Sequence, residues 1–173
     1  MGRVKTDRYL EFSLIALVLA LVWVVSDTIH ERVVVVGDSA PSFSVTTKTG
    51  KTIGPRNFEG QLLMVNFWAT WCPPCIEETP ALNALHQRFG SRGLTILGIS
   101  VDQNEKAYDD FVERFRIGYQ VARDPDADIS SGFGTYKYPE TYIIDRNGKV
   151  LEKIIGADWN LEQLSKRLEA MLG

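Results

Sequence analysis

Cysteine and histidine are both scarce in this chain, and their scarcity excludes several kinds of protein. Its 173 residues include two cysteines and two histidines. A small secreted scaffold held together by disulfides needs more cysteines than one pair. A structural zinc site needs about four ligands, and His30 and His86 lie on segments remote from Cys72 and Cys75. Covalent haem attachment needs histidine directly after the second cysteine, where this chain has Ile76, so we expect no metal and no other cofactor.

Strong charge of either sign and low-complexity sequence are also absent. The formal net charge is −3, with charged residues at 24% and hydrophobic residues at 45% of the chain, and both fractions are ordinary for a globular protein. Basic residues form no patch interleaved with aromatic side chains, so we expect no nucleic-acid partner. The length and the lack of an internal repeat indicate one domain with a small additional segment.

The one long hydrophobic run lies near the N-terminus and predicts a membrane anchor. Residues 12–25 carry no charge, and extending the run back to Tyr9 adds only Glu11 as a charge. The extended run lies near the lower limit for a spanning helix, which is about 17–25 residues. The residues before the run are basic, namely Arg3, Lys5 and Arg8. This excess of positive charge predicts a cytoplasmic N-terminus, with everything after the run outside.

In this interpretation the chain has three parts. Residues 1–29 form a cytoplasmic N-terminus and a single-pass transmembrane helix, residues 30–40 a linker, and residues 41–173 a domain on the outer, periplasmic side of the cell (inner) membrane. A cleaved signal peptide is a second interpretation, although no small-x-small pair follows the run. A buried helix of the domain is a third. Residues 30–36 would form a stalk or an extra strand, and the sequence leaves that choice open.

Strand and helix patterns alternate along the domain. Residues 62–68 and 94–101 are nearly continuous apolar runs, which are typical of buried parallel strands. A helix is expected from about Pro73, since proline suits the first helical position. A second helix is expected over residues 105–116. The apolar positions that predict the buried face of the first helix are Leu82, Leu85 and Phe89.

Two hairpins and a final helix complete the pattern. Residues 43–45 and 51–53 flank a polar turn, and residues 141–145 and 150–155 flank a loop with an Asn-Gly pair, the strongest hairpin signal in the chain. The last helix is predicted to begin after Asn160, a good N-cap. Its expected buried residues are Leu161, Leu164, Leu168 and Leu172. The order predicts an α/β fold whose mixed sheet has helices on both faces.

The chemistry concentrates where a buried strand ends and a helix begins. Cys72 would lie at the helix N-terminus, with Cys75 one turn further on. The partial positive charge of a helix N-terminus stabilises anions, and the thiolate is the species that attacks disulfides. We therefore assign Cys72 as the attacking nucleophile and Cys75 as the residue that resolves the mixed disulfide. A structural disulfide is the alternative, but so short a loop constrains the unfolded chain little.

Three segments carry a family resemblance. The run FWATWCPPC at residues 67–75, after an apolar strand, resembles the active-site segment of thioredoxin-fold proteins. GDSAPSFSVTTKTGKTI at 37–53 and KYPETYIIDRNGKV at 137–150 are similar to the N-terminal hairpin and the later loop and hairpin of the TlpA/ResA group. The resemblance extends from about Gly37 to the C-terminus. It implies a thioredoxin fold, with a central mixed sheet flanked by helices and an N-terminal β-hairpin, and thiol–disulfide oxidoreductase activity.

The resemblance also implies a substrate-docking loop. By this similarity Tyr138-Pro139 is the cis-proline loop facing the cysteine pair, which docks an extended substrate by backbone pairing. A cis bond is allowed because cis peptides are almost confined to X–Pro bonds, and an ordinary trans turn is the alternative. Trp71 is implied to flank the same substrate site.

Two acids match motif positions that lie near the active site in the ResA and cytochrome c maturation branch. They are Glu78, one turn after Cys75, and Glu140, directly after the proline loop. A carboxylate close to a thiolate raises the thiol pKa and can accept a proton from Cys75; a solvated surface acid is the alternative for each. Asn66 stands where cytoplasmic thioredoxins have a buried aspartate, so Glu78 would take over that proton transfer.

The residues between the cysteines indicate the direction of electron flow. Pro73 and Pro74 have no backbone N–H, so two potential donors to the Cys72 thiolate are missing. We expect a Cys72 pKa well above the ~3.5 of strong oxidants and therefore a reducing couple.

A reductant outside the cytoplasm needs a supply of electrons, and the predicted anchor would hold it near a donor. The resemblance implies an integral membrane thiol carrier as that donor and apocytochrome c, with its CxxCH site, as the protein disulfide substrate. The rival functions are a disulfide oxidase or isomerase, a thioredoxin-fold peroxidase, and a non-catalytic haem or metal chaperone.

Overall fold

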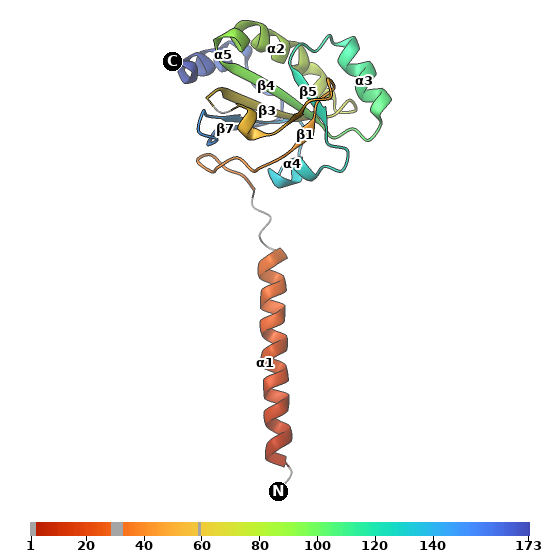
Figure 1. Cartoon of the computed structure of the whole chain (residues 1–173), viewed down its shortest axis with the longest axis vertical. Coiled ribbons are helices and arrows are strands. Elements are labelled where there is room, and N and C mark those ends of the chain that lie inside the picture. The colour runs from red at the N-terminus through yellow and green to blue at the C-terminus, as the bar shows by residue number, and fades with distance from the viewer. Residues whose placement is uncertain (1–2, 29–32, 59) are drawn as a thin grey trace. The chain divides into compact units, whose positions relative to one another are not determined.

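The computed structural model describes residues 3–28, 33–58 and 60–173. The chain divides into two units, Met1–Arg32 and Val33–Gly173. The described part of the first unit is helical, and the second unit contains two sheets with helices around them (Figure 1).

Helix α1, Arg3–Thr28, contains the apolar run. Large apolar side chains between Tyr9 and Val24 are exposed at positions all around it. A helix that is apolar on every side is typical of a membrane span or of a large protein's core. Within the described residues, however, no helix combines the length and hydropathy needed to cross a bilayer. The spanning anchor expected from the sequence therefore stays a prediction.

Five strands form the central sheet of the second unit. In chain order they are β3 (Leu62–Trp68), β4 (Leu94–Ser100), β5 (Gln120–Arg123), β6 (Glu140–Ile144) and β7 (Val150–Ile155). Their spatial order is β5-β4-β3-β6-β7. Strand β3 pairs in parallel with β4 and antiparallel with β6, which makes the sheet mixed. Every residue of β3 is buried, as expected of an apolar strand covered on both faces.

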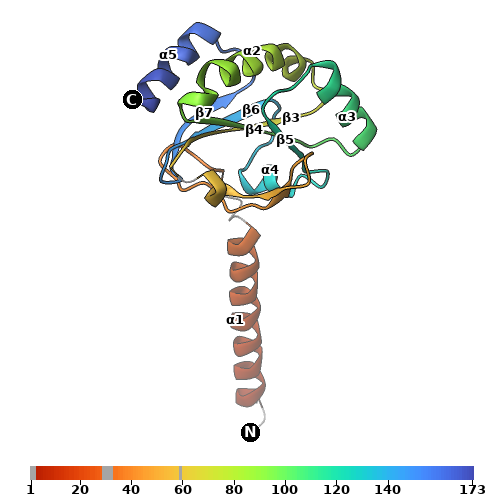
Figure 2. The same ribbon diagram turned by 45° about the horizontal axis from the view of Figure 1, so that its top comes forward.

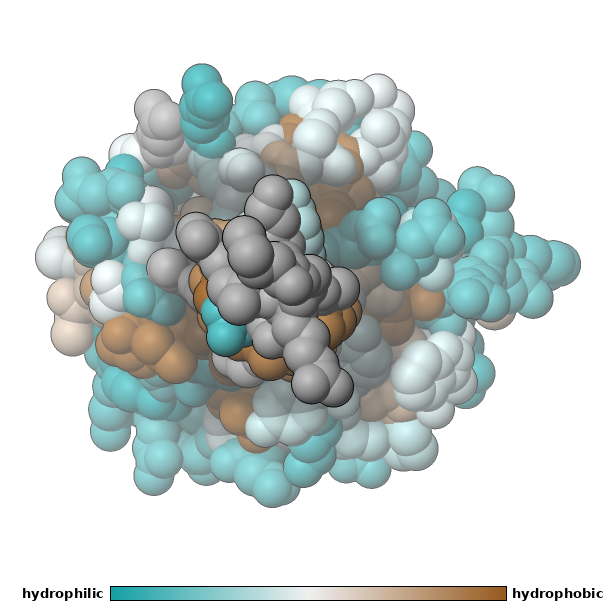
Figure 3. Space-filling view, turned by 90° about the horizontal axis from the view of Figure 1, so that it is seen from below, coloured by the Kyte–Doolittle hydropathy of each residue, from teal (hydrophilic) through white to brown (hydrophobic). Residues whose placement is uncertain are grey.

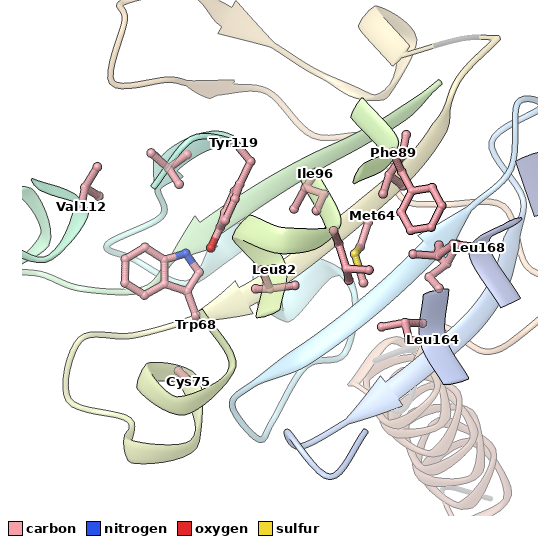
Figure 4. Packing of buried hydrophobic residues seen from close by; sticks show 14 of the residues in the cluster. Met64, Trp68, Cys75, Leu82, Phe89, Ile96, Val112, Tyr119, Leu164 and Leu168 are labelled. Carbon is pink, nitrogen blue, oxygen red and sulfur yellow. The ribbon is translucent and has the colours of Figure 1, made fainter. Parts of the chain in front are cut away.

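Helices and a hairpin cover the two faces of this sheet (Figure 2). The helices are α2 (Pro73–Phe89), α3 (Glu105–Arg114), α4 (Asp128–Gly132) and α5 (Leu161–Leu172), with the short 3-10 helices η1 (Pro55–Phe58) and η2 (Gly90–Arg92). On one face α2, α3 and α5 bury residues such as Phe89 and Leu168 (Figure 4). The other face is covered by the hairpin of β1 (Val45–Thr46) and β2 (Thr52–Ile53), and by Phe133 after α4.

The structure confirms the elements that were predicted from long apolar runs and from the Asn-Gly loop. The two apolar runs are β3 and β4, and the Asn-Gly loop joins β6 to β7. Asn160 caps α5, because its side-chain oxygen accepts hydrogen bonds from the N–H groups of Glu162 and Gln163. Strand β5 and helix α4 were not predicted. One predicted core residue is wrong, since Leu161 is 39% exposed at the first position of α5, one turn before the helix meets the core at Leu164.

The segment predicted as a linker lies partly against the domain. Val34 is buried in the core on the hairpin side. The N–H of Gly37 donates to the carbonyl of Val150, and the N–H of Val150 donates to the carbonyl of Asp38. Described residues 33–40 are thus held by backbone bonds along the start of β7, and this part of the predicted linker belongs to the domain. Residues 30–32 lie outside the described residues.

Two leucines of α5 test this packing, because the same substitution by alanine can be made at a buried and at an exposed position. Leu168 is fully buried, whereas Leu161 is 39% exposed. We expect Leu168→Ala to lower the free energy of unfolding by about 2–5 kcal/mol, because it leaves a cavity, and Leu161→Ala to lower it by less than about 1 kcal/mol. Denaturant unfolding of both variants provides the measurement. Equal losses would contradict the assigned buried face of α5.

Candidate active site

The cysteine pair lies at the junction of β3 and α2. Cys72 is the N-cap of α2 in an extended backbone conformation, and its Sγ accepts a hydrogen bond from the N–H of Cys75 at 3.3 Å. The two cysteines form a disulfide. Both are largely buried, with Cys72 the more exposed at 4% against 1% for Cys75. The predicted placement of the pair at a helix N-terminus is confirmed.

The first turn of α2 offers few hydrogen-bond donors. Pro73 and Pro74 occupy its first two positions and have no N–H. The N–H of Cys75 is therefore the first one of the helix that can reach the Cys72 sulfur. A helix usually presents several free N–H groups at this end, so a reduced Cys72 receives less stabilisation here than a cysteine followed by other residues would.

Asp102 fixes the loop that leads to Cys72. Its carboxylate accepts hydrogen bonds from the Thr70 N–H at 2.9 Å, the Thr70 hydroxyl at 2.7 Å and the Ser100 hydroxyl at 2.6 Å. Asp102 is buried and is the second residue after β4. The carboxyl ends of the parallel strands β3 and β4 meet at the same edge of the sheet. Asp102 was not predicted from the sequence, although that rule could have identified it.

The proline loop reaches the same edge from β6. The Tyr138-Pro139 bond is cis, as the resemblance implied. The Trp71 and Tyr138 rings contact each other edge to face, with centroids 6.1 Å apart, so the proline loop lies beside the loop before Cys72. Trp71 is 65% exposed, which leaves most of its surface open to a docking protein.

Glu78 is buried beneath the cysteine pair, one helical turn after Cys75. The Asn66 side-chain N–H donates to Glu78 Oε1 at 2.7 Å, and the Trp159 indole N–H donates to Glu78 Oε2 at 3.0 Å. Burial raises the pKa of Glu78 from 4.5 to about 7, although the hydrogen bonds from Asn66 and Trp159 oppose that rise. A carboxyl group with such a pKa can gain or lose a proton near neutral pH.

The two partners of Glu78 come from two further elements, and Asn66 links it to a third. Asn66 lies on β3 and donates a second hydrogen bond to the Thr141 hydroxyl of β6 at 3.0 Å. Trp159 lies in the loop between β7 and α5. Thr141 and Trp159 were not predicted from the sequence, because 75 residues separate Asn66 from Thr141 and 81 separate Glu78 from Trp159, and no local pattern joins them.

Glu140 lies apart from this cluster. Its side chain is fully buried and forms an ion pair with Lys153 at 2.7 Å. The Tyr142 hydroxyl also donates to it. Because side chains alternate along a strand, Glu140 and Thr141 point to opposite faces of β6. The structure therefore does not bring the Glu140 carboxylate together with Glu78, and its side chain does not face solvent beside the proline loop.

The described residues contain no group of three or more histidine, cysteine or acidic side chains arranged to hold a metal ion. His86 is half-buried on α2 with its ring against Tyr119, and His30 lies outside the described residues. The arrangement that remains is a dithiol at a helix N-terminus, a buried acid below it and a cis-proline loop beside it. This combination on a mixed sheet defines a thioredoxin-fold thiol–disulfide oxidoreductase.

Comparison with known proteins gives the family. A model of the AhpC/TSA family matches residues 36–153. The thiol-disulfide oxidoreductase ResA of Bacillus cereus is 36% identical over 137 residues, which cover 79% of this chain and 76% of that protein. ResA of Geobacillus thermodenitrificans is 31% identical over 142 residues, which cover 82% of this chain and 81% of that protein. The chain therefore belongs to the AhpC/TSA family and is a homologue of the ResA thiol-disulfide oxidoreductases within it.

A solved structure agrees with this assignment. A Chlorobium tepidum chain described as a thiol:disulfide interchange protein DsbE superposes with a TM-score of 0.75 and 30% identity. The match covers 81% of this chain and 99% of that one. The predicted thioredoxin fold and oxidoreductase activity are both confirmed.

The raised pKa of Glu78 predicts a pH-dependent stability. The pKa of this carboxyl group is 4.5 in the unfolded chain and about 7 in the folded chain. Between pH 4.5 and pH 7 the folded state therefore keeps a proton that the unfolded state has lost. Stability should therefore fall by up to about 3 kcal/mol as pH rises from 4.5 to 7. In Glu78→Gln this part of the pH dependence should disappear. Denaturant unfolding of the oxidised protein at pH 5 and pH 8 measures it, and an unchanged pH difference in the variant would contradict the raised pKa.

Proposed function

We propose that this protein reduces disulfides in exported proteins, with Cys72, Cys75 and Glu78 as its catalytic residues. The observation that carries the proposal is the first turn of α2, where Cys72 is followed by two prolines and Glu78 is buried one turn below Cys75. A thiolate with few donors is poorly stabilised, and a poorly stabilised reduced form makes a couple more reducing.

The reduction would proceed in two exchange steps. The Cys72 thiolate attacks one sulfur of the substrate disulfide, forms a mixed disulfide and releases the other substrate sulfur as a thiolate. Glu78 then takes the proton of the Cys75 thiol. The resulting Cys75 thiolate attacks the Cys72 sulfur, closes the Cys72–Cys75 disulfide and releases the second substrate thiolate. Two electrons pass to the substrate, and a membrane thiol donor must return two electrons to the pair.

The exposed surface around Cys72 supports docking of an extended protein segment. Trp71 is open to solvent and contacts the ring of Tyr138. Pro139 follows Tyr138 in the cis conformation, and its carbonyl already accepts a hydrogen bond from the Gly156 N–H, so pairing with substrate would use the backbone groups of Tyr138. Glu140 then acts from inside the fold, where its ion pair with Lys153 supports the loop.

The substrate we propose is the CxxCH site of apocytochrome c during cytochrome c maturation. The ResA and DsbE names of the relatives are those of thiol–disulfide enzymes. The match of Glu78 and Glu140 to motif positions of the ResA and cytochrome c maturation branch supports this substrate. An extracytoplasmic oxidase or isomerase is the alternative, and the redox potential distinguishes the two.

The redox potential of the Cys72–Cys75 couple is the first test. We expect a value well below the ~−180 to −210 mV of oxidising folding compartments. Equilibration of the full chain in detergent with a defined thiol buffer gives the value. A potential near ~−120 mV, typical of a strong oxidant, would overturn the reductase proposal.

Proline substitutions test the physical reason for that potential. Pro74→Ala supplies an N–H at the second helical position, where it can reach the Cys72 sulfur, and should raise the potential by about 30 mV or more. Pro80→Ala is the matched control, because Pro80 lies further along α2, away from the sulfur. An equal change in both variants would show that the donors at the first turn do not set the potential.

We further propose that α1 is a single-pass anchor that keeps the domain on the outer face of the cell membrane. The exposed large apolar side chains are concentrated on α1, whereas the face of the domain visible in Figure 3 carries many hydrophilic residues with several apolar patches among them. Basic residues precede the apolar run, which supports a cytoplasmic N-terminus. Attachment would hold the enzyme close to a membrane thiol donor.

Cell fractionation tests the anchor. The full chain should remain in the membrane pellet after alkaline carbonate extraction, and protease added to spheroplasts should remove the domain. A variant lacking residues 1–32 should be found in the soluble fraction. Release of the full chain by carbonate, or protection of the domain from protease, would contradict the proposal.

A further inference from the structure

Trp159 lies in the loop between β7 and α5 and contacts the buried acid of the active site. Its indole N–H donates to Glu78 Oε2 at 3.0 Å, while Asn66 Nδ2 donates to Glu78 Oε1 at 2.7 Å. The two oxygens of the carboxylate therefore have donors of different kinds. The Trp159 ring also packs against the core and borders an open groove of about 610 Å³ whose lining does not include Glu78.

We propose that Trp159 is a positioning residue for Glu78, which fixes Oε2 and leaves Oε1 as the oxygen that takes up the proton from Cys75. This inference rests on the proposed role of Glu78 in the exchange reaction. Trp159 lies outside the cysteine motif and the proline loop, and by this inference it helps to set the pH at which the enzyme works.

The chemistry of the donors distinguishes the two oxygens. The indole N–H of tryptophan can only donate, so a proton placed on Oε2 would compete with Trp159 for that oxygen. An asparagine amide has both a donor and an acceptor, and a threonine hydroxyl can take either role. Asn66 Nδ2 lies between Glu78 Oε1 and the Thr141 hydroxyl, at 2.7 Å and 3.0 Å.

Rotation of the Asn66 amide accommodates the proton on Oε1. In the rotated form the Asn66 carbonyl oxygen accepts one hydrogen bond from protonated Glu78 Oε1 and another from the Thr141 hydroxyl. Glu78 Oε1 and the Thr141 hydroxyl then keep Asn66 as their partner in both protonation states, and Trp159 does not have to move. Protonation at Oε1 therefore preserves the hydrogen bond from Trp159, whereas a proton on Oε2 would compete with it.

The surroundings of Glu78 support the same conclusion. Burial raises its pKa to about 7, and the hydrogen bonds of Asn66 and Trp159 act in the opposite direction. The titratable groups around it are the cysteine pair on the first turn of α2 and Tyr119, which precedes β5 and interacts electrostatically with Glu78. Loss of the Trp159 hydrogen bond should therefore destabilise the ionised carboxyl group and raise its pKa further.

The wild-type protein gives the first test. In the oxidised full chain in detergent, the cysteines do not titrate, so the indole N–H signal of Trp159 should shift with pH at the midpoint of Glu78, near 7. Trp159→Phe assigns this signal by its loss. The signal of Trp71, whose ring is exposed, should not follow that midpoint. A Trp159 signal that is constant between pH 5 and 9 would overturn the inference.

The Trp159→Phe variant gives the second test, because phenylalanine keeps an aromatic ring at the groove but has no N–H. The Glu78 carboxyl carbon, followed by NMR, should titrate roughly one pH unit higher than in the wild type. Release of substrate from the mixed disulfide should then be roughly fivefold slower at pH 7, and should approach the wild-type rate by pH 9. Gln163→Ala, an exposed change bordering the same groove, should leave the pH profile unchanged.

Glu78→Gln separates the possible failures. If Glu78→Gln keeps the wild-type rate and pH profile, the proposed role of Glu78 is wrong and the inference about Trp159 fails with it. If Glu78→Gln loses the pH dependence but Trp159→Phe matches the wild type in both measurements, the role of Glu78 stands and Trp159 has only a structural one.

Discussion

The antiparallel register of β6 on β3 is the constraint on which the site depends. It pairs Phe67 with Glu140 and Asn66 with Thr141. Because side chains alternate between the faces of a sheet, a slip of one residue would exchange the faces of Glu140 and Thr141. The ion-paired Glu140 would then lie beside Asn66 and Glu78, and the hydroxyl that accepts from Asn66 would point away. The same register sets Pro139, just before β6, beside the end of β3, from which the chain continues to Cys72.

Two buried acids flank this register on opposite faces of the sheet, and they are satisfied in different ways. Glu140 has a cation, Lys153, within 2.7 Å. Glu78 has only neutral donors, from Asn66 and Trp159, and its pKa is raised to about 7 by burial. Perturbed pKa values of this kind are concentrated at functional sites. The acid paired with a cation is therefore suited to support the fold, and the acid with neutral donors to exchange protons.

The loop between β3 and α2 joins the sheet to the chemistry. Asp102 holds its backbone through Thr70, and the prolines after Cys72 remove donors from the helix N-terminus. Asp102 thus gives Cys72 a rigid position, and the two prolines limit how far the helix N-terminus stabilises the Cys72 thiolate. Rigid placement and weak stabilisation together are what a dedicated reductant requires, because its thiolate must be available and must give up electrons readily.

The elements and residues whose signal is local could be predicted from the sequence alone. The apolar runs predicted β3 and β4, the Asn-Gly loop predicted the β6–β7 hairpin, and the spacing of Cys72 and Cys75 predicted a dithiol at a helix start. Strand β5 and helix α4 were missed because they are short, at 4 and 5 residues, and a few residues do not establish a period. Three facts emerge only from the folded chain: Glu78 is buried rather than solvated, Trp159 donates to it, and Glu140 faces the other side of the sheet. These facts depend on packing between segments up to 81 residues apart, and burial, which raises the pKa of Glu78, is a property of that packing and not of the residue.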